Sequence, residues 1–213
     1  MSIIECLDTT PSSVFRPRLP SSIYDGEKPI LEYRSSDLSN PAKNVYGKGI
    51  DEIVMRYDPS FNPARTYYYQ QDHEGTVTHL VNTSGSVVES YKYDAFGLPT
   101  IYDGSGNLIS SSGYSNRFLF TGREYATLFG FYEYRARAYH PGLGRFMSED
   151  PKLFDAGDYN LFRYCGNDPI DFTDPMGTET NYAGFSPLTN RNASVADDPT
   201  TESWPRLSGR GAI

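Results

Sequence analysis

Short stretches of alternating apolar and polar residues, each beginning just after a glycine, run through the middle of the chain. Three of them span residues 76–80, 86–93 and 107–109. A period of two is typical of a half-buried β-strand. The glycines close four copies of the pattern Asp/Asn-x-x-Gly, which end at Gly75, Gly85, Gly97 and Gly106. Because the Asp or Asn side chain bonds the backbone ahead of it and glycine supplies a positive φ, the pattern predicts antiparallel strands that reverse at these glycines.

The pair Tyr-Asp recurs with these turns and also upstream of them, at positions 24–25, 57–58, 93–94 and 102–103. We therefore expect a mainly β chain built as a Tyr-Asp repeat strand spiral, with antiparallel pairs from about residue 24 to about residue 135. Residues 141–177 are expected to form compact loops with one short helical turn near Leu161.

Aromatic residues mark where a core can form. Residues 24–177 contain 27 of the 31 Phe, Tyr and Trp residues of the chain. Each buried aromatic removes about 150–250 Å² from water, so the core is expected inside that range. The two ends are rich in Ser, Thr, Pro and Asn and show no periodicity. We expect both ends to be loose.

Charge and composition narrow the possible functions. The net charge is −8, with 27 acids against 19 bases, which argues against a broad basic face for nucleic acid. Arg135 and Arg137 stand among tyrosines, and we expect them to pack across strands against the rings. The three histidines and two cysteines have no metal-site spacing, so no cofactor or metal is expected. No apolar run is long enough to span a bilayer, and no signal-peptide core precedes residue 24, so the compartment stays unknown.

Motifs in the second half of the chain carry a resemblance to a known family. The segment Tyr91-Lys-Tyr-Asp-Ala-Phe-Gly97 is similar to the repeats of the Rhs/YD-repeat family. The later motifs resemble, in the same order, the Rhs repeat-associated core domain: Arg117-Phe-Leu-Phe-Thr-Gly-Arg-Glu-Tyr125, Tyr132-Glu-Tyr-Arg-Ala-Arg-Ala-Tyr139, Pro141-Gly-Leu-Gly-Arg-Phe-Met-Ser-Glu-Asp-Pro151, Asn160-Leu-Phe-Arg-Tyr-Cys-Gly-Asn-Asp-Pro169 and Asp174-Pro-Met-Gly177. Members of this family are polymorphic toxins, C subunits of insecticidal toxin complexes and wall-associated relatives.

The resemblance implies a hollow strand shell whose end is closed by the core segment. It also implies that the core segment cuts the chain after the last Asp-Pro-x-Gly, with an aspartyl-protease-like pair of acids. The matching acids here are Asp150 and Asp174, and Arg145 is the residue we expect to steady either the pair or the peptide. Two carboxylates brought close cannot both ionise, so one keeps a proton while the other activates water. The alternative is that each Asp only caps a turn, since Asp-Pro commonly begins one.

Several positions depart from the family pattern. Leu153 stands where the first motif has glycine, and Thr178 follows the last glycine where leucine is usual. His140 replaces an acid and Ala138 a tyrosine. A leucine disfavours a turn that needs a positive φ, and Thr178 leaves a leucine-shaped pocket partly unfilled. On these grounds we expect the purified chain to stay intact rather than to cut itself.

The motifs suggest four parts: a loose segment 1–23, a repeat region 24–116, a core-associated segment 117–177 and a variable, disordered tail 178–213. The tail has no His, Cys or Lys and few apolar residues, so its sequence does not predict a toxin domain. Our main hypothesis is a structural and processing end piece of an Rhs-type shell. The alternatives are a self-cleaving module cutting near Thr178 and an extracellular adhesive or carbohydrate-binding β-protein. Too few strands are present to enclose a toxin, so we expect a gene fragment or a partner: a larger repeat chain, or a second copy at open strand edges.

Overall fold

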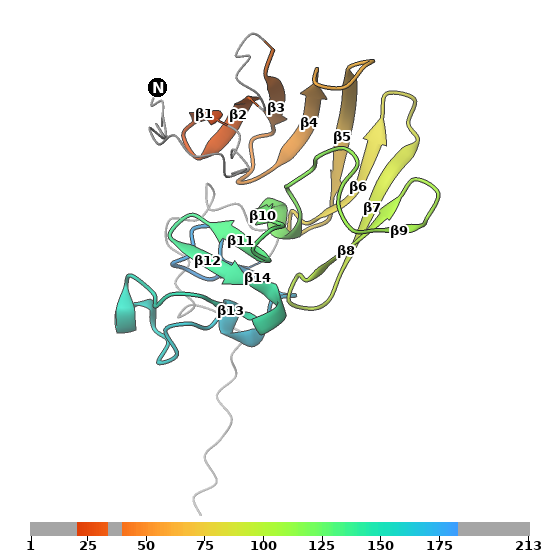
Figure 1. The fold of residues 1–213 in the computed structure, drawn as a ribbon. Coiled ribbons are helices and arrows are strands. Elements are labelled where there is room, and N and C mark those ends of the chain that lie inside the picture. The colour runs from red at the N-terminus through yellow and green to blue at the C-terminus, as the bar shows by residue number, and fades with distance from the viewer. Residues whose placement is uncertain (1–20, 34–39, 183–213) are drawn as a thin grey trace, which may run out of the picture.

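A nine-stranded antiparallel sheet forms the first part of the molecule (Figure 1). The computed structural model describes residues 21–33 and 40–182, so the predictions for the first residues and most of the tail lie outside the described residues. The strands neighbour one another in chain order, which confirms the mainly β, antiparallel prediction. They are β1 (Ser21–Asp25), β2 (Lys28–Tyr33), β3 (Ala42–Tyr46), β4 (Ile53–Asp58), β5 (Arg65–Gln71), β6 (Val77–Asn82), β7 (Val87–Tyr93), β8 (Pro99–Asp103) and β9 (Leu108–Ile109).

The predicted reversals are confirmed at all four glycines, each of which has a positive φ. In the β5–β6 turn, Asp72 Oδ1 accepts hydrogen bonds from the amides of Glu74 and Thr76, both at 3.0 Å, and the Gly75 amide donates to the Asp72 carbonyl at 3.1 Å. The turns that begin at Asn82, Asp94 and Asp103 repeat these bonds. One Asx pattern therefore builds every hairpin from β5 to β9.

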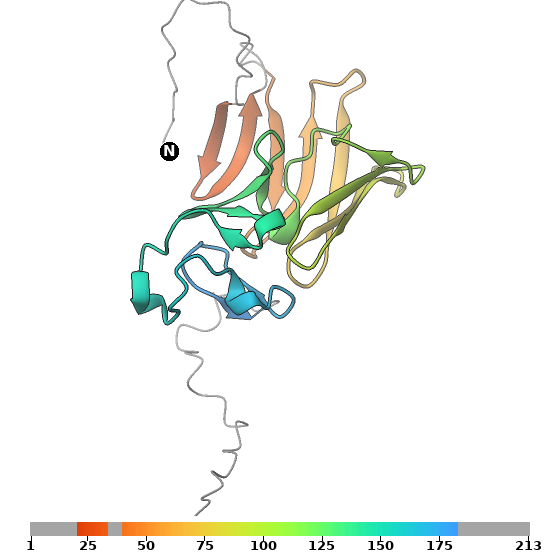
Figure 2. The ribbon, with the colours of Figure 1, turned by 60° about the horizontal axis from the view of Figure 1, so that its bottom comes forward.

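The second part continues the strand pairing beyond the predicted limit near residue 135. It contains a four-stranded sheet of β10 (Glu124–Ala126), β11 (Phe131–Tyr134), β12 (Arg137–His140) and β13 (Arg145–Phe146), and a two-stranded sheet of β14 (Phe172–Thr173) and β15 (Asn181–Tyr182). Figure 2 shows both against one end of the large sheet. Short 3₁₀ turns are η1 (Phe120–Gly122), η2 (Pro141–Leu143), η3 (Leu153–Ala156) and η4 (Cys165–Asn167).

The helical turn predicted near Leu161 is wrong in position. Leu161 lies in a non-helical turn, and η3 and η4 stand on either side of it. Its carbonyl oxygen instead accepts hydrogen bonds from the Asp150 amide at 2.9 Å and from Arg137 Nη1 at 3.1 Å. These long-range bonds satisfy the carbonyl that a local helical turn would have used.

Tyrosine rings fill the space between the two parts. Tyr132, Tyr134, Tyr139 and Tyr164 are all 0% exposed, and the rings of Tyr139 and Tyr164 are 4.3 Å apart. A buried tyrosine needs a partner for its hydroxyl. Tyr132 and Tyr139 find theirs in the carbonyls of the β7–β8 turn, each at 2.8 Å. The core therefore joins the two parts by hydrogen bonds as well as by apolar contact.

Residues 112–117, which we call the strap, lead from the last strand of the large sheet back across its face (Figure 1). Ser112 Oγ and the Gly113 amide both donate to Glu89 on β7 at 2.6 Å. Tyr67 and Tyr69 on β5 donate to Tyr114 O at 3.0 Å and Asn116 Oδ1 at 3.2 Å. Arg117 Nη2 pairs with Glu32 Oε2 on β2 at 2.9 Å. The strap thus ties β2, β5 and β7 to the segment that leads into β10.

Candidate functional site

Arg137 lies at the centre of the candidate site. It faces inward on β12, where it is 5% exposed, and its guanidinium carbon lies 3.6 Å from the centre of the Phe146 ring. Its Nη2 atom is 2.9 Å from Asp150 Oδ2 and 3.2 Å from Asp174 Oδ2. The two acids singled out from the sequence are therefore brought together, on one guanidinium nitrogen.

Each acid also caps a turn, as the alternative reading predicted. Asp150 Oδ1 accepts the Lys152 amide at 2.8 Å, and Asp174 Oδ1 accepts the amides of Thr178 and Glu179 at 2.9 and 3.0 Å. One carboxylate oxygen thus fixes the turn and the other meets Arg137. Each aspartate can therefore cap a turn and bind Arg137 at the same time.

Leu153 keeps the turn that its side chain was expected to disturb. Its φ is +51°, in the left-handed region, and its amide donates to the Asp150 carbonyl at 2.9 Å. This is the bond that glycine makes in the hairpin turns of the large sheet. The side chain is half exposed, so little packing holds it there. The departure at this position costs backbone strain but leaves Asp150 in place.

The peptide bond between Gly177 and Thr178 is held on both sides. The Gly177 carbonyl accepts a hydrogen bond from Arg137 Nε at 2.6 Å, while the Thr178 amide donates to Asp174. Gly177 has a φ of +68°, and an added Cβ would lie 2.3 Å from the Tyr134 carbonyl oxygen. Only glycine fits there, which explains why the motif ends on this residue.

The electrostatics favour one retained proton. Burial raises the pKa of the Asp174 carboxyl above its ordinary value, although the Glu179 and Thr178 amides and Arg137 act in the opposite direction. Two carboxylates share a single arginine here, so full ionisation would leave an uncompensated negative charge in a buried site. Asp174 therefore holds its proton more readily than an ordinary aspartic acid does.

Arg145 lies elsewhere in the site region. Its guanidinium covers the Phe162 ring at 4.5 Å, and its Nε is 3.5 Å from the Phe146 carbonyl oxygen. Arg137 is the arginine that binds both acids, a role that the sequence motifs did not predict for it. The available signal was its position two residues before the buried Tyr139, on the inward face of a strand. The neighbouring Arg135 also forms an internal ion pair, with Asp51 at 2.7 Å.

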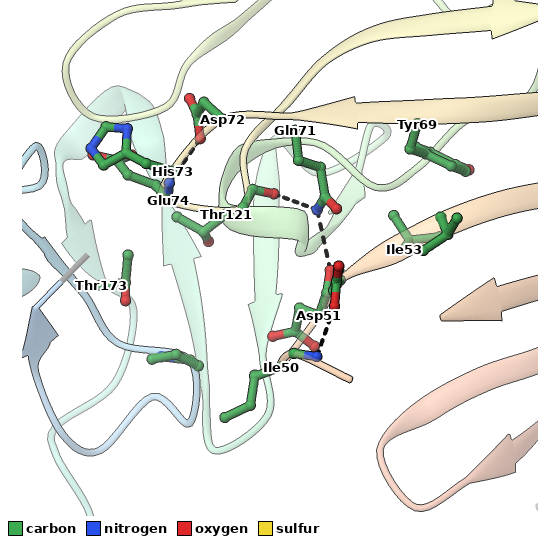
Figure 3. Close-up of a pocket in the computed structure, with 15 residues that line it drawn as sticks. Ile50, Asp51, Ile53, Tyr69, Gln71, Asp72, His73, Glu74, Thr121 and Thr173 are labelled. Carbon is green, nitrogen blue, oxygen red and sulfur yellow. Dashed lines mark hydrogen bonds and ion pairs between the residues drawn. The ribbon is translucent and has the colours of Figure 1, made fainter. Parts of the chain in front are cut away.

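Two cavities flank the segment that carries Asp174. The smaller, of about 210 Å³, is lined by Arg137, Asp150, Asp174 and Thr178 among others. The larger, of about 610 Å³, opens on the other side, with Thr173 and Pro175 in its wall (Figure 3). Most of its acids are already engaged: Asp51 pairs with two arginines, and Asp72 and Glu52 accept backbone amides. The chemistry therefore centres on the smaller cavity.

The described residues contain neither a metal-binding cluster nor a membrane-spanning helix. No cluster of three or more His, Cys, Asp or Glu side chains suited to a metal ion occurs within residues 21–33 and 40–182. Across the same ranges, no helix is long and apolar enough to cross a membrane.

The sequence of this chain is similar to those of several known proteins. No family model matches the chain. It is 30% identical over 157 residues to the tRNA3(Ser)-specific nuclease WapA of Bacillus spizizenii, covering 72% of this chain and 6% of the nuclease. It is 29% identical over 190 residues to the protein YibJ of Escherichia coli, covering 87% of this chain and 76% of that protein.

A chain in the structure of the Photorhabdus luminescens Tc holotoxin pore shares the fold. It superposes with a TM-score of 0.54 at 20% identity, over 74% of this chain and 8% of the toxin chain. These relatives support an Rhs-type, toxin-related chain. The chain spans only a small fraction of the nuclease and of the toxin subunit that it matches.

Proposed function

We propose that the chain is the end piece of an Rhs-type shell, in which residues 117–182 close the end of a strand wall. The observation that carries this proposal is the way the second part is fastened to the sheet. Asp51, between β3 and β4, forms ion pairs with Arg123 at 3.0 Å and Arg135 at 2.7 Å. Together with the strap, these pairs anchor the closing segment to β2, β5, β7 and the β3–β4 loop.

The remaining free edge is where a longer wall would join. β1 is the first strand in the sheet order, and within the described residues only β2 pairs with it. An unpaired edge offers a row of backbone donors and acceptors to another strand. The proposed role is structural closure of the wall.

Expression of the surrounding locus with a tag on this chain tests the proposal. A Tyr-Asp repeat chain, identified by mass spectrometry, should copurify with the wild type. Tyr24→Lys places a charge on the β1 edge and should abolish copurification. Tyr68→Lys changes an equally exposed tyrosine on the central strand β5 and should have no effect. Purification of the wild type without any repeat chain would contradict the proposal.

Self-cleavage between Gly177 and Thr178 is a second candidate function, and one observation favours it. The carbonyl oxygen of this peptide bond contacts Arg137, and its amide contacts Asp174, which shares Arg137 with Asp150. An electrophilic hydrogen bond on the carbonyl and two acids beside it are the groups that peptide hydrolysis requires. The positive φ of Leu153 removes one of the two grounds for expecting an intact chain.

Intact-mass measurement after a day at neutral and mildly acidic pH separates the two expectations. If the candidate site is active, the chain loses its last 36 residues, and Asp150→Asn and Asp174→Asn stay whole. Asp155→Asn, an exposed acid on η3, serves as the matched control and should cut like the wild type. Cleavage that survives both site variants would point to a contaminating protease and contradict the proposal.

A further inference from the structure

We propose that the hydroxyl of Thr178 is itself the nucleophile that breaks the Gly177–Thr178 bond, in place of a water molecule. The proposal rests on the self-cleavage proposed above and specifies its mechanism. A threonine hydroxyl is joined to the preceding carbonyl by a few covalent bonds, so its attack closes a five-membered ring without any loss of translational freedom. Thr178 is half-buried and lines the same small cavity as Asp150 and Asp174.

The carbonyl is prepared for such an attack. Arg137 Nε already donates to the Gly177 oxygen at 2.6 Å. The guanidinium cannot turn away, because Nη1 donates to the Leu161 carbonyl and Nη2 holds both acids. A fixed, buried cation on the carbonyl oxygen stabilises the negative charge that develops there in the tetrahedral intermediate.

The two acids divide the proton transfers. As the Thr178 oxygen bonds to the Gly177 carbonyl carbon, the hydroxyl proton passes to the Asp150 carboxylate. As the carbon–nitrogen bond breaks, the protonated Asp174 gives its proton to the Thr178 nitrogen, whose amide hydrogen Asp174 Oδ1 accepts at 2.9 Å in the intact chain. The product is an ester between Gly177 and the Thr178 side chain, with a free α-amine at Thr178. Burial raises the pKa of Asp174, which favours the protonated form that this step uses.

Water then completes the reaction. The ionised Asp174 takes a proton from the water that attacks the ester carbonyl, and the protonated Asp150 returns its proton to the departing Thr178 oxygen. The net change is hydrolysis of one peptide bond, and both acids regain their starting protonation. Threonine at this position is thus a functional alternative to the leucine that the sequence pattern leads one to expect.

Two measurements test the proposal. Neutral hydroxylamine captures an ester, so a wild-type sample treated with it should yield a fragment ending in a Gly177 hydroxamate, separable by mass from the free acid. Thr178→Val keeps the shape but lacks the hydroxyl, and its cleavage should be slower by roughly a hundredfold or more. Thr178→Ser should still cut. Thr100→Val, at an exposed position on β8 outside this cavity, should match the wild type.

The outcomes are distinguishable. Cleavage of Thr178→Val at the wild-type rate, with no hydroxamate from the wild type, would overturn the threonine mechanism and leave self-cleavage standing. A wild-type chain that stays whole under every condition would overturn both. Thermal melting of each variant separates loss of folding from loss of chemistry, and the hydroxylamine experiment needs no variant at all.

Discussion

Single residues in this protein carry two tasks at once. Asp150 and Asp174 each give one oxygen to a turn and the other to Arg137. The turn bonds fix the backbone and one carboxylate oxygen of each aspartate. The second oxygen is thereby held toward Arg137. The rigidity of such a site comes from local hydrogen bonds in the turns, and Arg137 adds contacts between residues that are far apart in the sequence.

Replacement of Leu153 by glycine should stabilise the fold. Leu153 has a φ of +51° and is 50% exposed, so glycine relieves strain at little cost in packing. We expect a gain of about 1 kcal/mol in the free energy of unfolding, measured by urea denaturation. Leu128→Gly, at an exposed position with an ordinary φ, is the control and should lower stability. A loss of stability in Leu153→Gly would show that the side chain packs better than its exposure indicates.

Glu74 should make stability depend on pH. Burial, with help from Asp72 and Asp171 and against the opposing charge of His73, raises the pKa of its carboxyl from 4.5 to about 7. The folded state therefore holds a proton that the unfolded state releases, and this contribution to stability is lost as pH rises from 4.5 through 7. Glu74→Gln cannot titrate. The melting temperature of the wild type should fall relative to the variant over this range, and a pH-independent difference would contradict the assignment.

At the scale of elements, the strap decides how the two parts are joined. Glu89 on β7 is 1% exposed, and its carboxylate accepts hydrogen bonds from Ser112, Gly113 and Tyr91. A buried carboxylate is costly unless donors surround it. Here the donors come mostly from the strap, so β7 and the strap stabilise each other.

Glu89→Gln should loosen this junction. The amide replaces one accepting oxygen with a donor, which leaves at least one strap group facing another donor. Since hydrogen bonds to charged groups are the stronger ones, we expect a loss of about 2 kcal/mol in urea denaturation. Glu133→Gln, whose side chain is 58% exposed, should cost less than about 0.5 kcal/mol. Equal effects in the two variants would mean that the strap is not held through Glu89.

At the scale of the whole molecule, the sheet is open. The second part covers one end, but the strand order begins at β1 and ends at the two-residue β9. Within the described residues β1 pairs only with β2, and such an edge favours pairing between copies, whereas the net charge of −8 opposes it. The edge contacts are directional and short-ranged, so they should prevail once concentration is high enough.

The isolated chain should therefore associate with itself. Sedimentation at tens of micromolar is expected to show species larger than the monomer, and Tyr24→Lys on β1 should shift them toward monomer. Tyr68→Lys adds the same charge away from the edge and should leave the distribution unchanged. A clean monomer for the wild type would argue against the edge as an association surface.

The turns could be predicted from the sequence because their physics is local. An Asx side chain and a glycine three residues later determine each reversal, whatever the rest of the chain does. The two acids were found through a family resemblance, but Arg137 was not. It meets Asp174 across 37 residues, through strand register that no local pattern encodes. The conformation of Leu161 could not be predicted locally either, because its carbonyl is bonded by the distant residues Asp150 and Arg137.

The short ladder between β14 and β15 would change its nature if the chain were cut. Phe172 pairs with Tyr182 and Thr173 with Asn181, across a loop that contains the Gly177–Thr178 bond. While the loop is intact, β15 is tethered beside β14 at an effective concentration in the millimolar range. After a cut, the contacts of the described residues must hold a separate peptide by affinity alone; they include two strand pairs, the Glu179 amide bond to Asp174 and the Lys152–Glu179 ion pair. The intact loop thus keeps β15 next to β14. Once the loop is cut, the segment that contains β15 can dissociate and diffuse away.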